Sequence, residues 1–168
     1  TFLLLPLGLI PSLAWLVFFL KEDVHPEPKR MIAKVFVYGA SITFLALALQ
    51  YFFRSILLIY GVTNIQFISF LIFAATEELS KFMVAYLVIR KSPYFDEPID
   101  AMIYLIASAL GFAMVENVAI LASASSLNQA LGVIVLRFVG ATLLHALSSG
   151  IVGYYWAKSI MKREHKRT

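Results

Sequence analysis

The chain contains no cysteine and few charged residues. Of its 168 residues, 14% are Asp, Glu, Lys or Arg and 61% are hydrophobic. Without cysteine, the fold has no disulfide and the chain has no thiolate to act as nucleophile or metal ligand. A soluble domain of this length could not bury so much apolar surface in one core, and the mean hydropathy is +0.84. The composition therefore predicts one integral membrane domain over residues 1–168.

Long apolar runs divide the chain into five predicted membrane-spanning helices. A helix needs roughly 20 predominantly apolar residues to cross the hydrocarbon core. The runs that meet this requirement cover about residues 2–20, 32–53, 65–89, 99–123 and 130–157. The first run lacks the basic front and the small-residue cleavage site of a signal peptide, so we expect it to be retained. The predicted fold is an all-α, polytopic transmembrane helical bundle.

Positive charge gathers on one side of this predicted bundle. Eleven of the 14 lysines and arginines lie in or beside the first loop, the third loop and the tail: Lys21, Lys29, Arg30, Lys34, Arg90, Lys91, Lys158, Lys162, Arg163, Lys166 and Arg167. The positive-inside rule then predicts an outer N-terminus and a cytoplasmic C-terminus, in what we expect to be a prokaryotic cell membrane. Contact with the lipid bilayer explains the basic tail. No recognition module accompanies the charge, so nucleic acid is not an expected partner, and the oligomeric state stays open.

Six ionisable residues lie inside the predicted spans, well away from their ends: Glu77, Glu78, Lys81, Glu116, Arg137 and His145. A charge at mid-span costs about 3 kcal/mol on insertion scales, so such side chains face protein or water and mark functional sites. At ~1.5 Å per residue, Glu77, Glu116 and His145 all fall within the hydrocarbon slab. Lys81 follows the two adjacent glutamates by four and three residues, so it can pair with either. The glutamates themselves point about 100° apart around the helix.

These interior residues have the chemistry for hydrolysis of an amide bond. A glutamate can act as general base toward water, and an imidazole and a hydroxyl can donate to a developing oxyanion. The chain has no HExxH motif, no aspartate deep in a span and no GxSG-type nucleophile setting, which disfavours the corresponding zinc, aspartyl and serine mechanisms. Glu77, Glu116 and His145 could together hold a divalent metal, although Lys81 would oppose a cation there. We favour no metal from the residues alone.

Three motifs on successive predicted spans resemble the signature of the PrsW-type intramembrane proteases. "EELSK" (77–81) matches an EExxK pattern, "FAMVE" (112–116) an FxxxE pattern and "HALSS" (145–149) an HxxxS pattern, in the family's order. The resemblance covers nearly the whole chain and departs from the family at Ala101 and Leu105, where glycines are expected. The wider superfamily includes the CAAX prenyl endopeptidases and bacteriocin-immunity-like membrane proteins.

The resemblance implies a glutamic-type intramembrane endopeptidase and gives roles to four catalytic residues. Glu77 with Glu116 would activate water, and His145 would stabilise the oxyanion. Glu78 would set the local electric field together with Lys81.

The resemblance also implies supporting residues and a substrate. Ser149, with Asn117, would assist at the oxyanion, and Phe112 belongs to the same motif as the glutamate on its span. The implied substrate is a membrane-anchored protein such as an anti-sigma factor. A metal-assisted version of the protease, a proton-coupled membrane carrier and a catalytically idle scaffold remain alternatives at this point.

Overall fold

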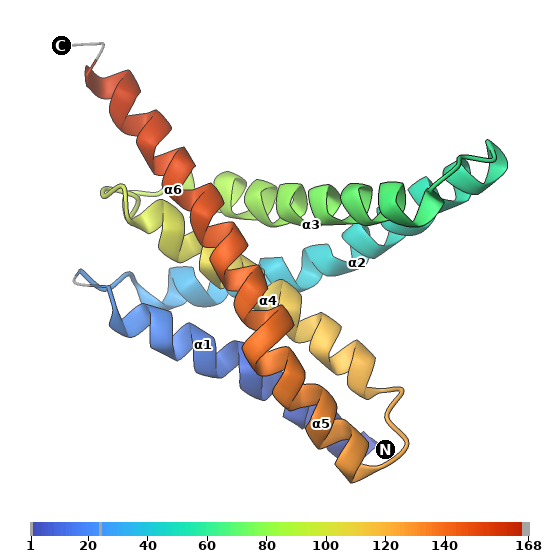
Figure 1. Ribbon diagram of the computed structural model, residues 1–168. Coiled ribbons are helices and arrows are strands. Elements are labelled where there is room, and N and C mark those ends of the chain that lie inside the picture. The colour runs from blue at the N-terminus through green and yellow to red at the C-terminus, as the bar shows by residue number, and fades with distance from the viewer. Residues whose placement is uncertain (1, 24, 166–168) are drawn as a thin grey trace.

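The structure, a computed structural model, describes residues 2–23 and 25–165, and over these residues it is all-helical, as predicted. Its elements, shown in Figure 1, are η1 (Phe2–Gly8), α1 (Leu9–Lys21), α2 (Lys29–Ile59), α3 (Ile65–Ile89), α4 (Asp100–Leu121), α5 (Leu127–Arg137), η2 (Phe138–Thr142) and α6 (Leu143–His165). The last three continue into one another as a single long rod.

Each apolar run corresponds to helical structure, but the helix boundaries agree with the predicted ones only in part. α3 begins and ends where the sequence predicts, whereas α2 starts earlier and runs on to Ile59. The first predicted span divides into the 3₁₀ segment η1, which contains Pro6, and the α-helix α1. Proline lacks an N–H group and clashes with the carbonyl four residues earlier, so a regular α-helix does not extend through this region.

Three helical stretches among the described residues are long and apolar enough to cross a membrane: Lys29–Ile59, Asp100–Leu121 and Leu127–Ile160. The apolar helix at Leu5–Lys21 is shorter, and α3 carries the three charged residues of the "EELSK" motif. That these two helices also cross the membrane stays a prediction. In Figure 1 the ends of α1, α3 and α6 lie on the left and the ends of α2 and α4 on the right, an alternation that successive spans require.

α4 forms the centre of the fold, with α2 and α6 packed against it. From Ala101 to Ala113 nearly every residue of this helix is buried. Glycine makes the approach of α2 possible, because a Cβ atom on Gly39 would overlap the carbonyl oxygen of Ser108. Gly153 brings α6 equally close to Met102. Small residues at such crossings let helices pack tightly in lipid, and here they hold three helices around one interior region.

The C-terminal rod contains a π-helical turn, η2, close to the ionisable residues. Trp15 of α1 donates a hydrogen bond from Nε1 to the carbonyl oxygen of Phe138 at 2.9 Å, so α1 is tied to this turn. π turns widen a helix locally and are frequent at functional sites. Arg137 precedes the turn and His145 follows it. The turn therefore sets how these two side chains are directed relative to each other.

Candidate active site

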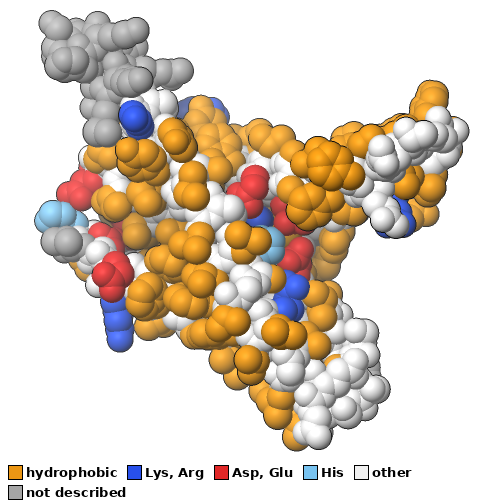
Figure 2. All heavy atoms as spheres, viewed as in Figure 1, with side chains coloured by type: hydrophobic (Ala, Val, Ile, Leu, Met, Phe, Trp, Pro, Cys, Tyr) orange, Lys and Arg blue, Asp and Glu red, His pale blue; other side chains and the backbone are white. Residues whose placement is uncertain are grey.

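Glu77, Glu116 and His145, from α3, α4 and α6, meet in the interior of the bundle. Each offers one oxygen or nitrogen atom, and these three atoms lie within 4.8 Å of one another. His145 Nε2 is 3.0 Å from Glu116 Oε2, and His145 Nδ1 is 3.9 Å from Glu77 Oε2. The three side chains keep 20%, 21% and 14% of their surface exposed, so none of them is sealed inside the protein. Figure 2 shows acidic, basic and histidine atoms gathered in a recess between apolar surfaces.

Lys81 lies behind these three residues and has no exposed side-chain surface. Its Nζ atom is 2.8 Å from Glu78 Oε1, 3.8 Å from Glu77 Oε2 and 2.7 Å from His145 Nδ1. The same atom lies 4.8 Å from the ring centroid of Phe112, which is fully buried on α4. A buried cation needs such partners because the interior does not solvate it. The lysine thus joins both glutamates of its own helix to the histidine of α6.

The contacts of His145 define its tautomer. A lysine ammonium group has only donors, so Nδ1 of His145 accepts a hydrogen bond from Lys81. The remaining hydrogen is then on Nε2, which donates to Glu116 Oε2. Both nitrogens of the imidazole are thus held by neighbouring side chains.

Glu78 points away from the group of three. Its Oε1 accepts from Ser148 Oγ at 3.0 Å and its Oε2 from Ser149 Oγ at 2.9 Å. The two glutamates diverge as helical geometry predicts, and Lys81 bridges them. Of the sequence-predicted residues, Glu78 and Ser149 therefore contact each other rather than the other three.

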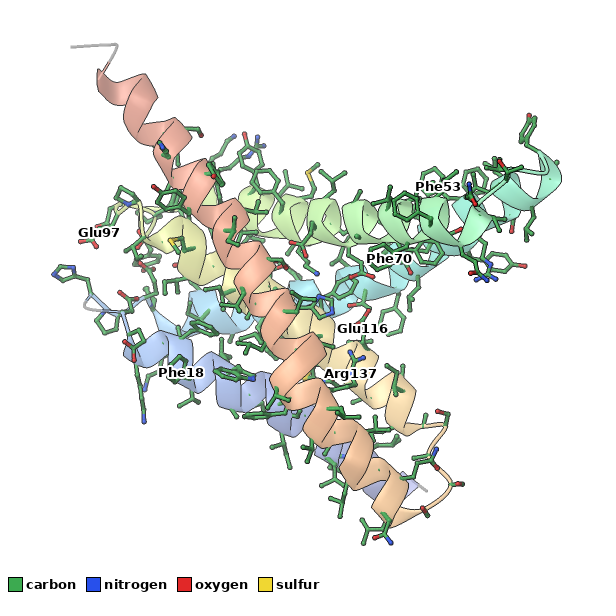
Figure 3. The ribbon with its side chains drawn as sticks, viewed as in Figure 1. Phe18, Phe53, Phe70, Glu97, Glu116 and Arg137 are labelled. Carbon is green, nitrogen blue, oxygen red and sulfur yellow. The ribbon has the colours of Figure 1, made fainter. Side chains whose placement is uncertain are left out.

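Glu116 is held by Arg137, which precedes the π turn. Arg137 Nη2 donates to Glu116 Oε2 at 3.0 Å, and its Nε donates to Asn117 Oδ1. Figure 3 shows Arg137 beside Glu116, next to the α5–α6 rod. Asn117 is buried, and its Nδ2 donates to Thr142 Oγ1 at 3.2 Å. Both polar ends of the Asn117 amide are thus engaged in holding α4 to the rod.

Gln50 of α2 is a site residue that the sequence analysis missed. Its Nε2 donates to Glu77 Oε1 at 3.0 Å, and the residue is 8% exposed. Gln50 is neutral, lies near the end of its predicted span and belongs to none of the three family motifs. The one feature of the sequence that could have indicated its role is a polar amide side chain within an apolar run.

The carboxylates of Glu77 and Glu116 accept hydrogen bonds from different donors. Glu116 Oε2 accepts from Arg137 and from His145. The nearest cationic or imidazole nitrogens to Glu77 Oε2 among the described residues are the 3.8 and 3.9 Å contacts above, beyond hydrogen-bonding distance. Glu77 Oε2, like Glu116 Oε1, accepts no hydrogen bond from the described residues and is available to accept one from water.

The same three residues fit a divalent metal. Two carboxylates and one imidazole are ligands that a catalytic zinc site uses, and their atoms are already within 4.8 Å of one another. Lys81 adds a positive charge beside the set, which weakens a cation's binding but leaves the ligand atoms in place. Donor type and spacing are compatible with a metal-holding site, in which His145 Nε2 would ligate without the hydrogen that it donates to Glu116 here.

The fold and site together define a helical membrane protein with a partly exposed group of acids and an imidazole in its interior. This is the class to which intramembrane proteases belong.

Comparison with known proteins identifies the particular family. Residues 27–168 match the model of the family described as PrsW family intramembrane metalloprotease. The chain therefore belongs to the PrsW family of intramembrane proteases, as the three motifs predict, and it is a protease rather than a carrier or an idle scaffold.

Curated relatives match over nearly all of the chain. Protease PrsW of Geobacillus kaustophilus is 31% identical over 159 residues, which are 94% of this chain and 67% of that protein. Protease PrsW of Oceanobacillus iheyensis is 29% identical over 164 residues, 98% of this chain and 73% of the relative. Protease PrsW of Bacillus subtilis is 27% identical over 171 residues, 99% and 73% of the two chains. No solved structure matches.

Proposed function

We propose that this protein hydrolyses a peptide bond of a membrane-anchored protein by means of water activated by Glu77, with Glu116 orienting His145. The convergence of these two carboxylates with His145, within 4.8 Å and at partly exposed positions, is the observation that supports the proposal. As a protease the chain requires a protein substrate. Because the site lies inside the bundle, we expect a substrate that itself lies in the membrane, such as a single-pass anti-sigma factor.

In the proposed reaction, Glu77 Oε2 accepts a proton from water while the water oxygen attacks the carbonyl carbon of the scissile bond. The carbonyl oxygen becomes an oxyanion, which the Nε2–H group of His145 stabilises by turning its hydrogen bond from Glu116 to the substrate. The C–N bond then breaks, and the proton on Glu77 passes to the leaving nitrogen. Glu116 orients the imidazole before this exchange and takes its hydrogen bond back afterwards.

The remaining site residues hold these groups in position. Arg137 fixes Glu116, and Lys81 fixes His145 through Nδ1. Ser149 and Asn117, for which the family resemblance implies oxyanion contacts, have their donors on Glu78 and Thr142. We assign the oxyanion contact to His145 and a supporting role to these two residues.

Reconstituted protein tests the proposal directly. Wild type and variants would be placed in liposomes with a single-pass membrane protein, and cleavage followed by gel and mass spectrometry. Glu77→Gln and His145→Ala should abolish turnover while their circular dichroism matches wild type. Glu22→Gln, the same change at an exposed residue at the end of α1, is the matched control and should cleave normally. Cleavage at wild-type rate by both site variants would reject the proposal.

A metal-assisted version of the same reaction is favoured by the fit of the three residues to a divalent ion and by the description of the matching family. Glu77, Glu116 and His145 would hold the ion, which would supply a Lewis acid and a more acidic water. Chelation followed by metal add-back separates the two versions. The glutamate mechanism predicts unchanged cleavage and no bound metal by elemental analysis. The metal version predicts loss and recovery, with metal content reduced in Glu77→Gln.

A further inference from the structure

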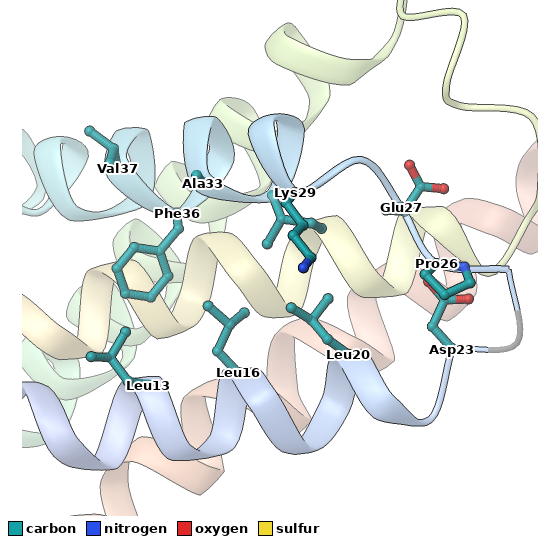
Figure 4. Close-up of a pocket in the computed structure, with 11 residues that line it drawn as sticks. Leu13, Leu16, Leu20, Asp23, Pro26, Glu27, Lys29, Ala33, Phe36 and Val37 are labelled. Atoms are coloured by element: carbon teal, nitrogen blue, oxygen red, sulfur yellow. The ribbon is translucent and has the colours of Figure 1, made fainter.

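An apolar groove between α1 and α2 lies apart from the protease site. It has a volume of about 400 Å³ and is walled by Leu13, Leu16 and Leu20 on one side and Ile32, Ala33 and Phe36 on the other. Figure 4 shows the three leucines in a row along α1, facing Phe36 across the groove. α1 packs chiefly on α4. The space beside α2 is therefore left for something else to fill.

One end of this groove is charged. Asp23, Glu27 and Lys29 line it, where the chain leaves α1 and enters α2 (Figure 4). Asp23 is only 8% exposed. Its Oδ1 accepts from the backbone N–H of His25 at 3.1 Å, but its buried Oδ2 has no hydrogen-bond partner among the described residues. A buried carboxylate oxygen without a donor is unfavourable, so a donor group that displaces the side chains enclosing this atom would be bound favourably here.

The groove thus offers three kinds of contact that a single ligand could make at once. Its apolar walls can pack against a hydrocarbon chain. Asp23 Oδ2 can accept a hydrogen bond from a cationic donor, and Lys29 can pair with an anion. If α1 crosses the membrane as α2 is able to, these groups occur in this order where the bilayer meets water.

We propose that the groove binds a phospholipid with a primary ammonium headgroup, of the phosphatidylethanolamine type. One acyl chain lies along the leucines of α1, the ammonium group donates to Asp23 Oδ2, and the phosphate contacts Lys29. A choline headgroup is cationic but has no N–H to donate, and a glycerol headgroup carries no positive charge. The site therefore selects by headgroup and not only by apolar area.

Native mass spectrometry of the wild-type protein tests the selection without any substitution. The protein in detergent would be offered phosphatidylethanolamine, phosphatidylcholine and phosphatidylglycerol with identical acyl chains, at equal concentrations. Phosphatidylethanolamine should be retained about tenfold more strongly than the other two, the factor expected for one charge-assisted hydrogen bond. Equal retention of the three lipids would overturn the proposal.

Matched variants locate the binding. Asp23→Asn should remove the preference for the ammonium lipid, whereas Glu22→Gln, one residue away and exposed, should keep it. Lys29→Gln should weaken retention of all three lipids, and its exposed neighbour gives the control Arg30→Gln. Ala33→Phe fills the groove and should displace every lipid.

Two results would contradict the assignment. In one, Asp23→Asn, folded as judged by circular dichroism, retains the lipids in the same ratio as Glu22→Gln. In the other, Ala33→Phe leaves lipid retention unchanged but prevents binding of a single-pass substrate, which would make the groove a docking site for protein. Because the readout is lipid retention, failure of this proposal is independent of the cleavage assay.

Discussion

Two groups of acidic residues in this protein are built differently. In each, three ligand-type atoms lie within 4.8 Å of one another: Glu77, Glu116 and His145 inside the bundle, and Glu27, Asp96 and Asp100 at the end of α4. The interior group is flanked by fixed cations, with Lys81 3.8 Å from Glu77 and Arg137 3.0 Å from Glu116. Hydrocarbon offers no other counter-charge, so the cations have to be part of the fold.

The group near the loops is stabilised by neutral donors. Glu27 accepts from the hydroxyl of Tyr104, and Asp100 Oδ2 accepts from the backbone N–H groups of Asp96 and Glu97 at 3.1 and 2.8 Å. Burial, with the nearby charge of Asp100, raises the pKa of Glu27 to about 7. A carboxyl that can take a proton from bulk water does not need a built-in cation. The interior carboxylates are therefore matched by cations of the fold, whereas the carboxyls near the loops are matched by neutral donors.

The largest expected difference between the two groups is in activity. Glu116→Gln removes the acceptor that orients His145 and one of the two proposed acidic groups, so the cleavage rate should fall by about a thousandfold. Glu27→Gln, the same change in the other group, should leave the rate near that of wild type. Initial rates on a reconstituted single-pass protein measure both. Comparable losses in the two variants would remove the functional distinction between the groups.

The next largest effect concerns stability. Lys81→Met leaves Glu77 and Glu78 without their cation and should lower the free energy of unfolding by about 3 kcal/mol. Thermal unfolding in detergent, followed by tryptophan fluorescence, measures the loss. Lys34→Met on the exposed face of α2 is the control and should change little.

A second substitution tests the cause of that loss. Adding Glu78→Gln to Lys81→Met should restore part of the stability, because it removes one uncompensated charge. A double variant whose loss equals the sum of the two single losses would show that the ion pair is not responsible.

Local helix geometry explains what the sequence could predict. The bounds of α3, the divergence of its adjacent glutamates and the bridging by Lys81 all depend on residues within five positions of one another or on one apolar run. The family motifs indicated, in addition, which membrane spans contribute residues to the site.

What the sequence could not predict depends on contacts between distant elements. Gln50 and Glu77 are 27 residues apart in the chain, and they meet only because α2 packs against α3. The π turn after Arg137 accepts a bond from Trp15, which is 123 residues from Phe138 in the chain. No pattern in 130–157 signals an extra-wide turn, so the run was interpreted as one regular helix.

A smaller effect is expected from Gln50, which positions Glu77 without contacting the proposed substrate. Gln50→Leu removes a hydrogen bond to a charged group, and kcat should fall by about tenfold with KM unchanged. A merely structural role would instead lower the fraction of folded, active protein and leave the kcat of that fraction unchanged. Active-site titration alongside kcat separates the two cases. Gln66→Leu on the exposed side of α3 is the matched control.

The smallest expected effect is the pH dependence of stability contributed by Glu27. Its folded-state pKa is raised from 4.5 to about 7, so the folded state binds the proton more tightly than the unfolded state. The resulting stabilisation is fully present below the ordinary pKa and is lost as the pH rises through about 7. Melting temperatures between about pH 5 and pH 8 should therefore fall more steeply for wild type than for Glu27→Gln. Glu22→Gln should keep the wild-type slope. Identical slopes for wild type and Glu27→Gln would mean that Glu27 is ionised across this range, and that the loop group, like the interior one, contains a counter-charge.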